Sequence, residues 1–176
     1  MISLLLILLP LLTGLAAFFI KDEKLARTWA VLASFATLTI AILSLCCMND
    51  TKSLNYHCEW LPSLGASFSL KMDGVAQLLC LLNTIAYPLV FIAGWDKTYK
   101  NAKNFFALML LAQAGIMGVF LAADALLFYF FWELALIPMY FLCSQWGGEK
   151  RVAVTFKFFI YTFIGSLLML ISILYL

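Results

Sequence analysis

The sequence predicts an all-α membrane protein with six transmembrane helices. Hydrophobic residues make up 65% of the chain, charged residues only 11%, and the mean hydropathy is +1.04. These values lie far outside the usage of soluble globular proteins. The chain also divides into uncharged runs of about 20 residues, the length that a helix needs to cross a bilayer core of about 30 Å. The runs are continuous and do not alternate in short segments, so they favour helices over the strands of a barrel.

The first three predicted spans are residues 2–20, 28–48 and 74–95. Asp73 and Asp96 bound the third run, which limits how far it extends. The first run could be mistaken for a signal peptide, but a signal peptide carries its basic residues before the apolar region. Here no basic residue precedes Ile2 and three follow the run. We therefore expect a retained helix whose amino terminus lies on the outer side of the membrane.

The last three predicted spans are residues 104–123, 125–148 and 152–176. The fifth contains a single charge, Glu133, and the sixth a single charge, Lys157. We expect the six spans to form one transmembrane domain over residues 1–176. The chain stops inside apolar sequence, without the aromatic or charged flank that marks an interface, so we expect it to be truncated.

Basic residues are distributed very unequally between the connections. Eight lie in the connections that would face the inner side, and two lie outside: Lys21, Lys24, Arg27, Lys97, Lys100, Lys103, Lys150 and Arg151 against Lys52 and Lys71. By the positive-inside rule, the amino terminus and the loop 49–71 are expected to face the periplasm of a bacterial inner membrane. We expect the basic residues to serve topology, and no nucleic acid as a partner.

Residues that could hold a redox cofactor or a metal are scarce. The only histidine, His57, falls in the predicted outer loop, so no span offers an axial haem ligand. The cysteines are odd in number and show neither a cluster for iron–sulfur nor a disulfide framework; they are Cys46, Cys47, Cys58, Cys80 and Cys143. We therefore expect no cofactor, no metal and no redox active site in this chain.

Glu133 is the first candidate for function. It lies nine residues after Asp124, which at about 1.5 Å per residue is roughly 13 Å into the bilayer. An ionisable group at that depth is costly, and one that can exchange a proton when its neighbours change is what a proton relay requires. The alternative is that Glu133 only hydrogen-bonds across the bundle. That is the less favoured interpretation, because Gln or Ser would pack helices at lower cost.

Pro138 and a polar stripe support a functional Glu133. The ring of Pro138 leaves the carbonyl of Leu134 without its helical donor, one residue from the acid. At 100° per residue, four polar side chains fall within about 40° of one line on the helix. They are Tyr129, Glu133, Tyr140 and Ser144. Aromatic packing alone could also put tyrosines there.

Lys157 admits two interpretations from the residues alone. A lysine this close to the start of a span can extend its ammonium to the interface. However, a cation near the amino-terminal end of a helix opposes the helix dipole, so helix stability does not call for it. Asp73 and Asp124 each precede a span and are expected to be N-caps. Small residues at 114, 118 and 122 are expected to let a neighbouring helix approach closely.

Four stretches carry a resemblance to a known family. The run FYFFWELALIPMYFL at 128–142 resembles the glutamate-bearing fifth helix of the M subunits of bacterial NADH:quinone oxidoreductase (complex I), the counterparts of mitochondrial subunit four. The segments LKMDG at 70–74, GVFLAADALLF at 118–128 and KFFIYT at 157–162 are similar to the same family in the same order. The resemblance covers essentially the whole chain.

The resemblance implies a proton-translocating, antiporter-like subunit in the membrane arm of an enzyme complex. Glu133 would then be the intramembrane acid of a half-channel and Lys157 a basic residue of the same relay. The partners would be other membrane-arm subunits, with NADH, FMN, iron–sulfur clusters and quinone handled in partner subunits. Family members have about fourteen helices in inverted repeats, so this chain would hold only part of one.

Two other functions stay open. Related subunits belong to multi-subunit sodium/proton antiporters, which are secondary transporters, although the WELALIPMYFL and KFFIYT stretches favour complex I. A six-helix piece could also be only a structural remnant. The residues beyond Leu176, where a lysine in an interrupted seventh helix is expected, would distinguish these possibilities.

Overall fold

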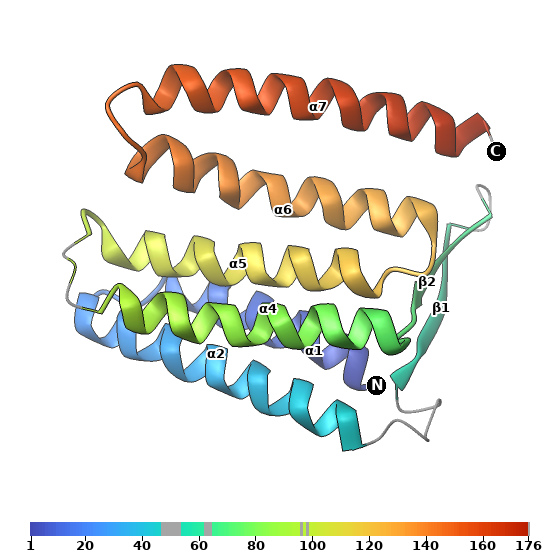
Figure 1. Ribbon diagram of the computed structural model, residues 1–176, viewed down its shortest axis with the longest axis horizontal. Helices are drawn as coiled ribbons and strands as arrows, with labels where there is room; N and C mark the ends of the chain where they lie inside the picture. The colour runs from blue at the N-terminus through green and yellow to red at the C-terminus, as the bar shows by residue number, and fades with distance from the viewer. Residues whose placement is uncertain (47–53, 62–64, 96, 98, 176) are drawn as a thin grey trace.

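Helices dominate the computed structural model, which describes residues 1–46, 54–61, 65–95, 97 and 99–175. In chain order these residues form eight elements: α1 (Ile2–Ala17), α2 (Glu23–Cys46), β1 (Tyr56–Leu61), β2 (Ala66–Leu70), α4 (Gly74–Ala93), α5 (Ala102–Leu121), α6 (Ala125–Trp146) and α7 (Arg151–Tyr175). The helices run side by side along one direction (Figure 1). Within this described part, five are long and apolar enough to cross a membrane, so a multi-pass helical membrane protein is confirmed.

The helix ends differ from the edges of the apolar runs. Helix α1 is shorter than its run and ends at Ala17. The amides of Phe18, Phe19 and Ile20 bond to carbonyls three residues back, so the chain tightens into turns there. Helix α2 instead begins at Glu23, inside the charged stretch. Charged residues limit the length of chain that can lie in the lipid core, but a helix can continue beyond the lipid into water.

Helix α5 is the centre of the bundle. It packs against α1, α2, α4 and α6, and most of its length is buried. Its small residues allow this: a Cβ on Gly115 would lie 2.8 Å from the Cα of Ala135 on α6, and a Cβ on Gly118 would overlap the ring of Phe131. The expected close approach at Gly118 is therefore confirmed, and Gly115 extends it. Helix α7 lies at the edge, packs against α6 and buries only Thr155 and Ser166.

One end of the bundle carries a β-hairpin where the apolar pattern predicts a loop. Strands β1 and β2 pair antiparallel, with Tyr56 opposite Leu70. The α5–α6 linker extends this sheet, since Lys71 N donates to Leu121 O and Ala123 N donates to Ser69 O, both at 2.9 Å. The hairpin thus closes over the ends of α5 and α6 (Figure 1).

The connections divide cleanly between the two ends. The links from α1 to α2, from α4 to α5 and from α6 to α7 lie together at the end opposite the hairpin (Figure 1). All eight basic residues assigned to inner connections belong to these three links or to the helix turns beside them. We call this end the basic end. The arrangement fixes which loops share a side, and the direction of the bundle in the membrane stays a prediction.

Candidate functional site around Glu133

Helix α6 carries Glu133 near its middle, and a side-chain cap fixes where the helix begins. Asp124 is the N-cap, and its Oδ1 accepts from Leu126 N at 2.9 Å and Leu127 N at 3.2 Å. The helix then runs through the buried Pro138 to Trp146 without interruption. Asp73 caps α4 in the same way, accepting from Ala76 N at 2.8 Å. Both expected N-caps are therefore confirmed.

The Glu133 carboxylate is half-buried and incompletely satisfied. Its Oε1 is buried and has no hydrogen-bond partner among the described residues. Its side chain interacts with that of Tyr129, one turn earlier on α6, and Tyr129 also interacts with Ser166 of α7. Leaving a buried carboxylate oxygen unpaired is costly in a low-dielectric setting. Such an oxygen can accept a hydrogen bond from water.

The polar stripe of α6 faces α7. The ring of Tyr140 packs edge-on against Phe159 of α7 with centroids 5.1 Å apart. Ser144, at the far end of the stripe, donates its hydroxyl to Phe141 O of its own helix, 3.2 Å away. The opposite face of α6 packs on α5. Glu133 therefore lies on the side of α6 that faces the outermost helix.

Lys157 is not part of this cluster. Its side chain is exposed on α7, and the described residues contain no ion pair between it and Glu133. Lys157 is six residues from the start of α7, whereas Glu133 is thirteen residues from the end of α6. At about 1.5 Å per residue these positions differ in depth by roughly 10 Å, which explains why the two charges do not meet.

Buried neutral polar groups were missed by a search of the sequence for charges. Gln113, on α5, is fully buried, and neither atom of its amide has a hydrogen-bond partner in the described part of the chain. It lies eight residues before Leu121, so its depth is close to that of Glu133. Asn83 Nδ2 on α4 is likewise buried without a partner among the residues that the structure describes. The sequence signal that could have identified Gln113 is a glutamine inside an otherwise apolar run.

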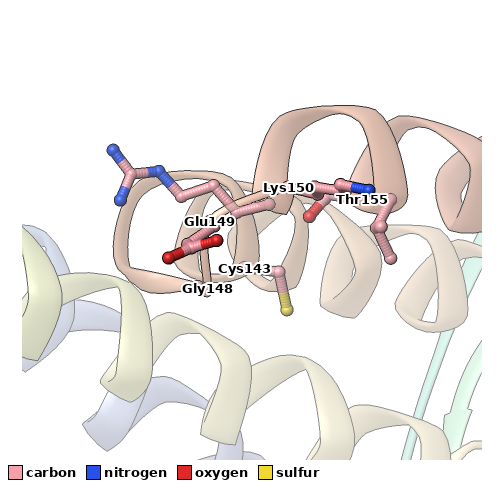
Figure 2. A pocket seen from close by; sticks show the side chains of 8 residues that line it. Cys143, Gly148, Glu149, Lys150 and Thr155 are labelled. Atoms are coloured by element: carbon pink, nitrogen blue, oxygen red, sulfur yellow. The ribbon is translucent and has the colours of Figure 1, made fainter.

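A surface pocket lies far along α6 from Glu133. It has a volume of ≈ 310 Å³ and sits at the α6–α7 turn, where Cys143, Gly148, Glu149, Lys150 and Thr155 line it (Figure 2). None of these residues belongs to the polar stripe. The pocket therefore offers no route to the candidate acid.

Comparison with known proteins finds a family match over the segment that contains α6 and α7. Residues 122–176 match the family described as NADH:quinone oxidoreductase/Mrp antiporter, TM. F(420)H(2) dehydrogenase subunit M of Methanosarcina mazei is 39% identical over 172 residues, covering 96% of this chain and 35% of that protein. NADH-quinone oxidoreductase subunit M of Buchnera aphidicola is 32% identical, covering 97% of this chain and 37% of that protein.

A solved structure extends the similarity to three dimensions. A chain of respiratory complex I from Thermus thermophilus superimposes with a TM-score of 0.82 at 27% identity, covering 98% of this chain and 35% of that one. This chain spans about a third of the length of the relatives it matches. It is thus similar over nearly its whole length to subunit M of F(420)H(2) dehydrogenase and of NADH-quinone oxidoreductase, and its residues 122–176 match the NADH:quinone oxidoreductase/Mrp antiporter transmembrane family.

Proposed function

We propose that this chain is part of a proton-translocating membrane subunit of a quinone-reducing oxidoreductase complex and that Glu133 is its proton relay. The observation that carries the proposal is the buried Oε1 of Glu133, which has no hydrogen-bond partner in the described part of the chain and lies midway along a helix long and apolar enough to span a membrane. A carboxylate that only held two helices together would have its oxygens paired across the bundle. Glu133 instead keeps an acceptor open.

The neighbours of Glu133 provide the beginning of a path. Tyr129 lies near both Glu133 and Ser166, and the Ser166 hydroxyl donates to Phe163 O of its own helix at 2.9 Å, so three polar side chains gather where α6 meets α7. Hydroxyl groups both donate and accept hydrogen bonds, which a proton passing between sites requires. Pro138 adds the carbonyl of Leu134 as a further acceptor beside the acid.

Lys157 is proposed as a second station closer to the basic end. Its exposed position on α7 leaves room for further helices of the same subunit to cover it, since the relatives are about three times as long as this chain. The depth difference of roughly 10 Å means that water or further residues would have to connect Lys157 with Glu133.

The redox chemistry is proposed to reside in partner subunits. The two subunit M relatives are named for different electron donors, F(420)H(2) and NADH, although both match this chain over nearly its whole length. A membrane subunit shared between different donors is expected to serve proton movement. NADH, FMN, iron–sulfur clusters and quinone are therefore assigned to other subunits, and the complex is proposed to lie in a bacterial inner membrane with the amino terminus periplasmic.

The experiment compares Glu133→Gln with Glu133→Asp in the complete complex. Quinone reduction and proton pumping are measured together in sealed vesicles. We expect Glu133→Gln to abolish pumping or reduce it strongly, because an amide cannot bind and release the proton, whereas Glu133→Asp retains part of it. Glu149→Gln, which removes an exposed carboxylate at the α6–α7 turn, is the control and should pump normally.

Full pumping in Glu133→Gln would show that the residue only packs helices, because Gln keeps the shape and the hydrogen bonds. The related antiporters provide a second candidate function, since the matching family includes them. A pH gradient that collapses on addition of sodium, without electron transfer, would favour that alternative.

A further inference from the structure

A second pocket lies at the basic end, between the α4–α5 loop and the end of α6. Its volume is ≈ 280 Å³. Its polar and charged lining consists of Lys100, Asn101, Ser144, Gln145, Trp146 and Arg151. The pocket is separate from Glu133, so its ligand chemistry does not depend on the proton relay.

The pocket is positively charged. Lys100 comes from the α4–α5 loop and Arg151 from the first turn of α7, and both side chains are exposed. Neither makes an ion pair with another described residue, and none of the described residues that line the pocket is acidic. The nearest described acid along the chain, Glu149, lines the adjoining pocket without pairing with Arg151. Two cations from separate segments thus line one pocket, and no described residue of its lining carries a counter-charge.

The frame of the pocket is already formed. Trp146 Nε1 donates to Lys100 O at 2.9 Å, which ties the loop to the last turn of α6 across 46 residues of sequence. The Trp146 ring packs edge-on against Phe105, with centroids 5.3 Å apart, and Phe105 stacks on Tyr99 at 4.2 Å. The backbone of Lys100 is therefore fixed beside the end of α6, at the edge of the pocket that Lys100 and Arg151 both line.

Asn101 adds a donor that its own helix does not use. It is the N-cap residue of α5, yet its side chain makes no capping hydrogen bond. Its backbone is left-handed, with φ 56° and ψ 52°, a conformation that Asn tolerates better than most residues. Capping would normally engage an asparagine side chain at this position. Here the amide lines the pocket instead, together with the amide of Gln145.

The chemistry of the pocket selects an anion with several oxygens. A guanidinium donates two parallel hydrogen bonds to phosphate, an ammonium adds a compact charge, and neutral amides complete the oxygen shell. The position of the pocket indicates which molecule would supply this anion. The pocket lies where α6 ends and α7 begins, and it is walled by a tryptophan, the residue type enriched at the level of lipid headgroups.

We propose that this pocket binds the phosphate of an anionic phospholipid headgroup at the basic end of the bundle. Basic pockets between transmembrane helices suit such headgroups on the side that carries the basic loops. Binding would fasten the α4–α5 loop to the α6–α7 turn and add a specific contact to the general attraction of the eight basic residues.

The test measures lipid binding to the purified protein in detergent by native mass spectrometry. The probes are phosphatidylglycerol, phosphatidylcholine and inorganic phosphate. We expect retention of phosphatidylglycerol over phosphatidylcholine, and a loss of about tenfold or more in that retention for the double variant Lys100→Gln/Arg151→Gln, because two charge-assisted contacts disappear. The matched control Lys21→Gln/Lys24→Gln removes two exposed charges at the same end and should keep the retention.

A milder variant guards against misfolding. Trp146→Phe keeps an aromatic ring but cannot donate to Lys100 O, so we expect it to weaken phosphatidylglycerol binding while its unfolding temperature stays near that of the matched control. Equal loss in both double variants would overturn the proposal in favour of diffuse attraction. Competition by inorganic phosphate that displaces the lipid at equal concentration would instead identify free phosphate as the ligand, and would also overturn it.

Discussion

The carboxylate of Asp124 accepts a hydrogen bond from the backbone amide of Ser67, 3.1 Å away and 57 residues earlier in the chain. Its two oxygens have different tasks. Oδ1 caps the first turn of α6, whereas Oδ2 holds strand β2. One side chain thus joins the hairpin to the helix that carries Glu133.

Substitutions at Asp124 should separate these two tasks. Asp124→Asn keeps an oxygen for the amides of Leu126 and Leu127 but presents an NH₂ group to Ser67 N, so the cap should survive and the hairpin contact should be lost. Asp124→Ala removes both contacts. Because the helix cap is also lost, we expect its free energy of unfolding to be about 1–2 kcal/mol lower than that of Asp124→Asn. Thermal unfolding and hydrogen exchange at the Ser67 amide measure the two effects. Unchanged exchange in Asp124→Asn would contradict the assignment.

Gly115 should tolerate no side chain. In Gly115→Ala the new Cβ would meet the Cα of Ala135 at 2.8 Å, and because backbone cannot turn aside, α5 and α6 must separate. We expect the free energy of unfolding to fall by about 1–3 kcal/mol, which would be measured as a lower unfolding temperature in detergent. Gly165→Ala on α7 is the control, because nothing in the described chain lies within 4 Å of its added Cβ. Equal unfolding temperatures for the two variants would show that the helices are not in close contact.

Arg27 should not be replaceable by lysine. Its guanidinium donates to Trp95 O and to Lys97 O, and it lies over the Trp95 ring at 5.7 Å. A single ammonium cannot reproduce that planar, two-carbonyl contact, so Arg27→Lys should destabilise the loop after α4 by about 1 kcal/mol although the charge is kept. Limited proteolysis of residues 94–101 measures the effect. Lys24→Gln removes a charge one turn earlier and should leave cleavage unchanged.

The orientation of the bundle can be tested at Cys58. Its side chain is exposed on β1, at the end away from the basic connections. In a variant that keeps Cys58 and replaces the other cysteines with alanine, a membrane-impermeant thiol reagent should label the protein from the outer face of spheroplasts. A matched variant that keeps only the buried Cys80 should stay unlabelled from either side. Labelling of Cys58 from the cytoplasmic face alone would reverse the predicted topology.

The sequence alone predicted all five helices of the described chain that are long and apolar enough to cross a membrane, and only its first span, 2–20, forms a shorter helix, Ile2–Ala17. Lipid offers no hydrogen bonds to the backbone, so a long uncharged run has helix as its solution whatever surrounds it. N-capping by Asp73 and Asp124 is equally local, because each carboxylate serves amides within three residues of itself. The depth of Glu133 then follows from helix rise along a single element.

The hairpin needed the tertiary structure. Its second strand is completed by the linker at residues 121–123, which lies 50 residues or more further along the chain. Two further contacts join segments that no local sequence pattern relates. Arg27 donates to the carbonyls of residues 95 and 97, and Trp146 donates to the carbonyl of Lys100.

Tertiary structure also decided which face of each helix is buried. In water an apolar stripe marks the packed face, but lipid tails are as apolar as leucine, so hydrophobicity does not distinguish a face that meets lipid from one that meets a helix. Gly115 against Ala135, the full burial of Gln113 and the turning of Glu133 toward α7 therefore depend on shape and on the fit of neighbouring backbones, which only the assembled bundle specifies.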